Sequence, residues 1–228
     1  MKNKIFAKGF CFKKAFLLFT VGCIIGNYYE QILNLVTHYY NDGTIFWEYR
    51  RGVIYGPFSP IYGVGMLLFV WLLTLKPLNN LKTFIYGSII GGTFEYLVSF
   101  FQQAFVGTTS WDYTGYFLNI NGRTTIPFMM FWGLGALFTV KIFYPWFSNL
   151  VEKIPYKIGT IIYNILFVFL ITDMIISFTA LLRQNLRRHD IPPYTVAGQI
   201  YDKIYPDEVL HHYFPNMVES KWLYYLLV

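Results

Sequence analysis

Apolar residues run along the chain in five long stretches separated by polar segments. The stretches cover residues 15–35, 60–75, 84–105, 126–147 and 158–182. A helix of about 20 residues crosses a hydrocarbon core about 30 Å thick. Unpaired backbone groups are costly in lipid, and the stretches lack the alternation of barrel strands, so each one predicts a helix. The pattern therefore predicts an all-α fold, a polytopic membrane bundle of about five transmembrane helices.

The polar segments divide the chain further. Segments 36–59 and 106–125 are long and rich in Gly, Tyr and Trp, whereas 76–83 and 148–157 are short. Residues 1–182 therefore form a transmembrane domain, which a polar tail of residues 183–228 follows. From residue 196 onward the tail alternates apolar and charged residues. This alternation predicts one or two short amphipathic helices that lie on the membrane or on the protein.

Two parts of the transmembrane domain repeat one pattern. Gly26-x-x-x-Glu30 recurs as Gly91-x-x-x-Glu95, and an aromatic-Gly-x-Gly pattern starts at both Tyr62 and Trp132. The copies are offset by 65 to 72 residues. This repeat predicts two tandem helical hairpins, about 15–75 and 84–147, followed by a fifth helix at 158–182. Tandem copies share one orientation, so both long polar segments should lie on one face of the membrane.

Composition agrees with a membrane protein and excludes a soluble globular enzyme. Hydrophobic residues make up 55% of the chain and charged residues only 13%, against about 25% charged residues in a soluble domain. The net charge is +6, and cations that flank apolar spans meet anionic headgroups, so nucleic acid is not an expected partner. The two predicted faces carry nine and eight Lys or Arg residues, which leaves the orientation open.

Several ionisable residues fall inside or near the ends of the apolar stretches. A lone charge at the bilayer centre costs at least about 2.5 kcal/mol, so Glu30 and Glu95 need partners. Arg50, Arg51 and Arg123 enter from the long polar segments and are the candidates. These groups either form structural Glu–Arg pairs or line a polar cavity that contacts a substrate. Asp173 is an intramembrane acid with two possible roles. It either pairs with Lys141 or stays protonated and hydrogen-bonded between helices.

The two long polar segments contain turns rich in aromatic residues, at 50–65 and 111–123, which we expect to dip back and pack together over the helix ends. We predict a polar substrate cavity there. Its candidate residues are Glu30, Arg50, Arg51, Tyr55, Tyr62, Glu95, Tyr96, Trp111, Asp112, Tyr113, Asn119, Asn121, Arg123 and Trp132. We predict no catalytic residue, metal ligand or cofactor, because no phosphate-binding loop and no hydrolase or metalloprotease motif occurs.

Several segments in fixed order carry a family resemblance. They are residues 51–65, Gly91 to Tyr96, Trp111-Asp-Tyr, Asn119-Ile-Asn-Gly and Trp132-Gly-Leu-Gly, with Tyr205-Pro-Asp-Glu and Phe214-Pro-Asn-Met in the tail. Together they resemble the bacterial ABC-transporter permease family of the CmpB type, over about residues 26–217. Ser110 departs from the pattern, since the family often has a second Trp there. The resemblance implies a multi-pass subunit of the bacterial plasma membrane that moves a substrate with a separate ATPase.

Three functions remain open at this point. A transporter subunit predicts an ATPase partner and a cavity between the hairpins. A membrane enzyme acting on a lipid or its headgroup predicts a cleft open on one side with lipid access. A non-catalytic assembly subunit predicts that the tail docks onto another protein. The partners considered are therefore membrane lipid, a separate ATPase subunit and further copies of the chain.

Overall fold

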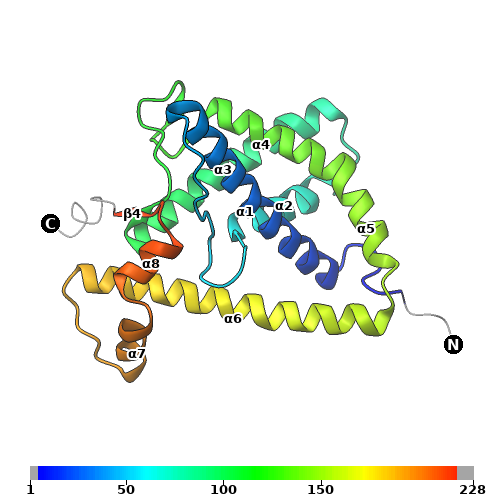
Figure 1. Cartoon of the computed structure of the whole chain (residues 1–228). Coiled ribbons are helices and arrows are strands. Elements are labelled where there is room, and N and C mark those ends of the chain that lie inside the picture. The colour runs from blue at the N-terminus through cyan, green and yellow to red at the C-terminus, as the bar shows by residue number, and fades with distance from the viewer. Residues whose placement is uncertain (1–4, 220–228) are drawn as a thin grey trace.

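The computed structural model describes residues 5–219 and is mostly helical, with almost no sheet (Figure 1). The α-helices are α1 (Phe12–Asp42), α2 (Pro60–Leu73), α3 (Asn80–Val106), α4 (Ile126–Phe138), α5 (Tyr144–Glu152), α6 (Tyr156–Arg188), α7 (Val196–Ile204) and α8 (Asp207–Tyr213). The strands are β1 (Thr108–Thr109), β2 (Asn119–Ile120), β3 (Thr124–Thr125) and β4 (Val218–Glu219). This confirms the all-α fold. Residues 220–228, part of the predicted amphipathic tail, lie outside the described residues.

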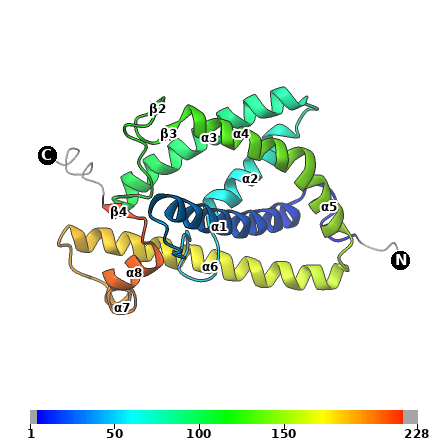
Figure 2. The same cartoon turned by 45° about the horizontal axis from the view of Figure 1, so that its top comes forward.

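Four helical segments are long and apolar enough to cross a membrane. They are α1, α3, α6 and the continuous helix Ile126–Glu152, in which the π-helical turn η1 (Thr139–Phe143) joins α4 to α5. Pro145 follows this turn, and since proline lacks an N–H and crowds the preceding turn, it accounts for the local widening. Figure 2 shows the helix bending between α4 and α5.

The predicted span at 60–75 is shorter than a full crossing. The helix α2 has 14 residues, which gives a length of about 21 Å. It begins at Pro60, a residue suited to the first helical turn, and ends before Thr74. Antiparallel to α1, it packs Val70 in one cluster with Leu17 and Leu18, near the start of α1. The rest of this crossing is therefore made by the non-helical chain that precedes Pro60.

Residues 43–59 dip back into the bundle as a re-entrant segment. In Figure 1 this segment descends from the end of α1 toward α6 and then turns up into α2. Its tip is closed by the hydrogen bond from Gly52 N to Phe58 O, at 2.9 Å. Val53 and Ile54 at the tip are only 1% exposed. The tip of the segment is thus covered by protein, the condition under which irregular backbone is tolerated at membrane depth, whereas residues 43–47 are exposed.

Polar groups of α1 and α6 satisfy the backbone of the re-entrant segment. Ser59 N donates to the Cys23 carbonyl at 3.0 Å. Ile54 N donates to Ser177 Oγ at 2.8 Å, and Tyr55 N donates to Asp173 Oδ1 at 3.1 Å. These bonds explain why α6 carries Ser177 and Asp173 in an apolar stretch.

Small residues allow close packing within each hairpin. A Cβ atom added to Gly22 would lie 3.0 Å from the Gly63 Cα atom. At the position 65 residues later, a Cβ atom on Gly87 would lie 3.4 Å from the Gly133 Cα atom. Close backbone approach of this kind stabilises helix pairs in lipid, where no hydrophobic effect drives association. The α1–α2 and α3–α4 pairs therefore use corresponding positions, as the sequence repeat predicts.

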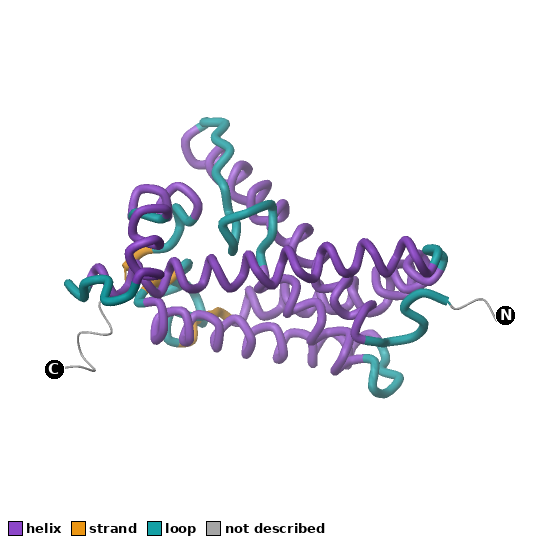
Figure 3. The backbone as a smooth tube through the Cα atoms, turned by 90° about the horizontal axis from the view of Figure 1, so that it is seen from below, coloured by secondary structure: helices purple, strands orange, loops and turns teal. Residues whose placement is uncertain are grey.

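The loops and the tail gather at one end of the bundle. β1 pairs antiparallel with β4, which ties the second long segment to the tail. Ile54 of the re-entrant segment packs in one cluster with Tyr205, Leu210 and Phe214 of the tail. At the other end, Lys14 of α1 binds Glu152 of α5 at 2.5 Å. Figure 3 shows these two ends separated along the length of α6. Both long polar segments thus lie toward the same end of the helix bundle.

The tail docks on α6 through ion pairs as well as apolar contacts. Arg183 donates from Nε and Nη2 to the two carboxylate oxygens of Asp202, at 2.8 and 2.9 Å. Arg187 donates to Asp202 at 2.6 Å and to Asp207 at 2.6 Å. A planar guanidinium that grips a carboxylate with two bonds fixes orientation as well as distance. This network holds α7 and α8 beside the loop face.

The glycine contacts predict different outcomes for two neighbouring substitutions in α4. In Gly133→Ala the new methyl group would lie 2.7 Å from the Phe84 carbonyl oxygen, so the hairpin must shift. We expect a loss of about 1–3 kcal/mol, measured as a lower melting temperature in detergent. Gly135→Ala is the matched control because its methyl group meets no atom within 4 Å. Equal melting temperatures for the two variants would contradict this packing.

The tail network predicts a pH dependence. Hydrogen bonds from Arg183, and secondly from Arg187, lower the pKa of Asp202 below its ordinary value of 3.8. A carboxylate with a depressed pKa stabilises the docked tail above the ordinary value, and this contribution is lost as the pH falls through the depressed pKa. A fluorophore on Lys203→Cys, in a Cys11→Ser background, should report a docked tail down to about pH 4. The mobility of the tail should increase as the pH falls further, through the depressed pKa of Asp202.

Asp202→Asn should loosen the tail at neutral pH and remove the acid transition. If the anisotropy of the fluorophore follows the same pH profile in both proteins, the Asp202 network does not hold the tail.

Candidate functional site

The two repeated glutamates lie on corresponding turns of the two hairpins and use hydroxyl partners. Glu30 on α1 accepts a hydrogen bond from the Tyr62 hydroxyl at 2.8 Å. Glu95 on α3 accepts bonds from the Tyr113 hydroxyl at 3.1 Å and from Thr124 Oγ1 at 2.6 Å. Burial raises the pKa of the Tyr113 hydroxyl, so this group stays a donor. Each acid is thus oriented by hydroxyl groups that follow it in the sequence of its own hairpin: Tyr62 on α2 for Glu30, and Tyr113 and Thr124 before α4 for Glu95.

Stacked aromatic rings connect the two acids. Tyr62 and Trp132, the corresponding aromatic residues of the two copies, stack with ring centroids 5.8 Å apart and planes at 29°. Tyr62 bonds Glu30, and the Trp132 side chain interacts with Glu95. The repeat therefore brings its four most distinctive side chains to one place, where the hairpins meet.

A cavity of about 790 Å³ lies at this junction. Eight of the sequence-predicted site residues line it: Glu30, Arg50, Arg51, Tyr62, Glu95, Trp111, Tyr113 and Trp132. Its walls come from both hairpins and both long polar segments, and Asn216 and Met217 of the tail complete them. The volume is in the range of small-molecule sites, about 300–1,000 Å³.

The expected Glu–Arg pairs do not form among the described residues. Arg50 instead bonds Glu48 at 2.7 Å and Asn34 at 2.9 Å. Arg123 bonds Ser99 at 3.1 Å and also donates to Gln103. Ser99 lies 65 residues after Asn34, so each arginine binds the polar residue one turn beyond its glutamate. The arginines fix the loops to the helices, and the carboxylates are left facing the cavity.

Arg51 is held mainly by neighbours of its own loop and the tail. Its Nη1 donates to the Ile54 carbonyl at 3.1 Å. Its guanidinium lies 4.3 Å from the centre of the Tyr49 ring and 5.2 Å from that of Tyr213. Stacking of this kind stabilises the cation in a partly desolvated place. Arg51 thus links the re-entrant segment to α8 at the edge of the cavity.

Five other predicted residues build the loop around 111–123 and do not line the cavity. Asp112 accepts from Thr114 N at 2.8 Å, and hydrogen bonds from Thr114 lower its pKa. Asn119 accepts from Gly122 N, Asn121 donates to the Tyr96 hydroxyl, and Trp111 donates to the Arg123 carbonyl. Their polar groups are used within the loop and its contacts with α3. Loop architecture therefore explains Tyr96, Asp112, Asn119, Asn121 and Arg123.

The sequence prediction missed polar residues on the same helix faces as the acids. Asn34 and Thr37 lie one and two turns beyond Glu30, and Gln102 lies two turns beyond Glu95, all lining the cavity. Positions i, i+4 and i+7 share one face of a helix. Extending the helical periodicity outward from each glutamate would have found them.

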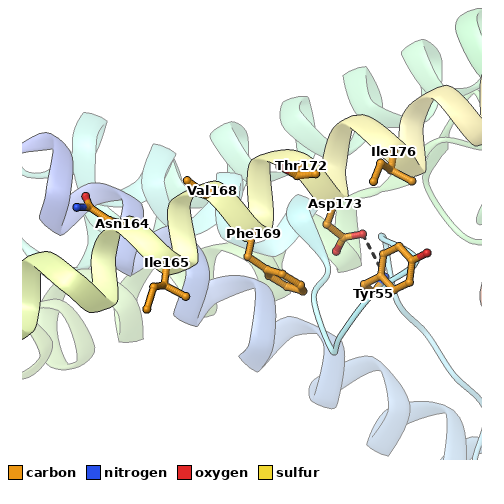
Figure 4. A pocket seen from close by; sticks show the side chains of 8 residues that line it. All are labelled: Tyr55, Asn164, Ile165, Val168, Phe169, Thr172, Asp173 and Ile176. Atoms are coloured by element: carbon orange, nitrogen blue, oxygen red, sulfur yellow. Dashed lines mark hydrogen bonds between the residues drawn. The ribbon is translucent and has the colours of Figure 1, made fainter.

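Asp173 lies in a second place, apart from the central cavity. Pairing with Lys141 was one of the two alternatives for this acid, and it was wrong, because Lys141 donates to the Leu78 carbonyl in the connection after α2. Asp173 accepts from Tyr55 N and from Ser177 Oγ, at 3.1 and 3.2 Å. With Tyr55 it lines a groove of about 730 Å³ along α6 (Figure 4). The other lining residues are mostly apolar: Asn164, Ile165, Val168, Phe169, Thr172 and Ile176.

No metal or disulfide chemistry is assembled in the part of the chain that the structure describes. Within residues 5–219, no three His, Cys, Asp or Glu side chains come close enough to hold a metal ion. Cys11 and Cys23 are both free thiols. The chemistry available at the central cavity is therefore that of carboxylates, guanidinium groups, hydroxyls, amides and aromatic faces.

Comparison with known proteins gives one clear family assignment. A family model described as "Putative ABC-transporter type IV" matches residues 17–178. The matched range includes nearly all of both hairpins, the re-entrant segment, most of α6, and the cavity lining other than Asn216 and Met217. Comparisons with curated proteins and with solved structures give no match. With its four long apolar helices, the chain is a multi-pass membrane protein that belongs to this ABC-transporter family.

Proposed function

We propose that the chain is a permease-like subunit of the cell membrane that binds its transported substrate in the cavity between the two hairpins. The observation that carries the proposal is the convergence of Glu30 and Glu95, one from each hairpin, on a single cavity. Ionisable residues inside membrane spans usually face a pathway or a partner. Substrate sites between repeated units and beside broken helices are also a common transporter design.

Two further features support transport. The α2 crossing is half helix and half re-entrant segment, and irregular backbone at this depth is tolerated where it lines a cavity or lies within protein. Gly52 and Ser59 of the re-entrant segment, and Pro60 at the start of α2, line the cavity itself. Movement of this segment or of the tail residues Asn216 and Met217 would change access from the loop face.

Energy for transport would come from a separate ATPase. The family description supports an ABC-type partner. No phosphate-binding loop occurs in the sequence. The tagged full-length chain, purified from its own cells in mild detergent, should therefore retain a nucleotide-binding subunit. Purification without any ATPase, under conditions that preserve the fold, would contradict the transporter proposal and favour a membrane enzyme or an assembly subunit.

Glutamine substitutions test the cavity directly. Glu30→Gln keeps an oxygen that accepts from the Tyr62 hydroxyl. Glu95→Gln keeps an oxygen for the Tyr113 hydroxyl, and its amide NH2 group can donate to Thr124 Oγ1, so both variants should fold with melting temperatures near wild type. Loss of the negative charge should reduce substrate-stimulated ATP hydrolysis of the complex about tenfold or more, since a hydrogen bond to a charged group contributes about 1.5–3 kcal/mol.

Glu208→Gln is the matched control, because the same change is made on an exposed side chain of α8. If the cavity variants and this control keep equal stimulated activity, the two acids are not part of the substrate site.

A further inference from the structure

Two carboxylates and two guanidinium groups line the central cavity, and their partners differ. Among the described residues, Glu30 and Glu95 receive hydrogen bonds from hydroxyl groups and make no ion pair. Arg50 pairs with the Glu48 carboxylate, and Arg51 is held by a carbonyl and two tyrosine rings. The two cavity carboxylates therefore lack a close cationic partner, which a ligand can supply.

An uncompensated carboxylate at membrane depth is expensive, and a positive charge brought by a ligand relieves that cost. Glu95 is only 6% exposed, so its desolvation is substantial. An inorganic divalent cation would need about six oxygen ligands. Two acids from different hairpins, separated by rings, do not supply such a cage. The acids instead suit a larger cation that touches both.

The cavity walls provide aromatic faces for such a cation. Tyr29, Tyr62, Trp111, Tyr113, Phe128 and Trp132 line the cavity. Aromatic faces attract ammonium groups, most strongly when the site is desolvated, and also pack against an apolar body. Tyr113 and Phe128 stack with centroids 4.8 Å apart and form one continuous wall beside Glu95. Carboxylates combined with aromatic walls favour a positive charge carried on an apolar framework.

We propose that the cavity binds an organic cation, a protonated or quaternary amine on an apolar body, with Glu30 and Glu95 as its counter-charges and the Tyr62–Trp132 stack against its apolar part. The inference rests on the proposed function, since it names the substrate class of that same site. It makes the two acids specificity-determining residues.

Two probe ions of the same shape and opposite charge test this proposal. Tetraphenylphosphonium and tetraphenylborate would be titrated into the full-length protein in detergent micelles, with empty micelles as the blank. The phosphonium should bind saturably, and at least tenfold more tightly than the borate. The double variant Glu30→Gln/Glu95→Gln should lose at least tenfold in phosphonium affinity, and Glu208→Gln should keep it.

A second variant keeps the test valid if the double variant is unstable. Gly135 lines the cavity and has open space where its Cβ would be, so Gly135→Leu fills the cavity and leaves the acids unchanged. This variant should also weaken phosphonium binding. Equal affinity for both ions, a preference for the borate, or phosphonium binding that neither variant reduces would overturn the inference. Selective borate binding that Gly135→Leu abolishes would refute the cation class alone, because the cavity would remain a ligand site.

Discussion

The structure depends on one constraint, which is that polar groups at membrane depth must find their partners within the protein. Lipid offers no hydrogen bonds, so each buried N–H group or carboxylate that lacks a partner costs several kcal/mol. The re-entrant segment 43–59 breaks the second crossing and exposes backbone donors that a helix would have satisfied. Cys23, Asp173 and Ser177 accept from Ser59, Tyr55 and Ile54 in its place. The polar residues of α6 follow from the broken crossing.

The same constraint shapes the central cavity. Close packing at Gly22 with Gly63, and at Gly87 with Gly133, holds the helices of each hairpin together. The long segments then fold back along the outer turns of α1 and α3, where Arg50 and Arg123 bind Asn34 and Ser99. Because the arginines are used in this way, the glutamates one turn deeper are left to hydroxyl partners and to the cavity. Because the arginines have a structural role, the carboxylates of the site have hydroxyl partners and no arginine partner.

Much of this arrangement could be predicted from the sequence. Apolar length predicts the long helices, and the 65-residue offset between Gly26-x-x-x-Glu30 and Gly91-x-x-x-Glu95 brings the acids together through α1 and α3. The partners of the charges were harder to predict, because opposite charge favours Glu–Arg pairing while geometry favours Asn34 and Ser99. The pairing of Asp173 with Lys141 failed for a related reason. The turns at residues 50–65 indicate that this segment dips back, but they do not show that its backbone needs Asp173 as an acceptor. The shortness of α2 is visible only once that segment is placed.

The central claim is that the two hairpins meet at Tyr62 and Trp132, where the rings stack 5.8 Å apart. The most direct measurement is cross-linking of Tyr62→Cys with Trp132→Cys in native membranes, in a Cys11→Ser background, with a short bifunctional thiol reagent. The account predicts an efficient intramolecular link, found by mass spectrometry of the joined peptides. It also predicts none for a control pair on the exposed faces of two helices, Ile85→Cys with Ile165→Cys. A folded protein in which positions 62 and 132 do not link more readily than the control pair would contradict a shared cavity.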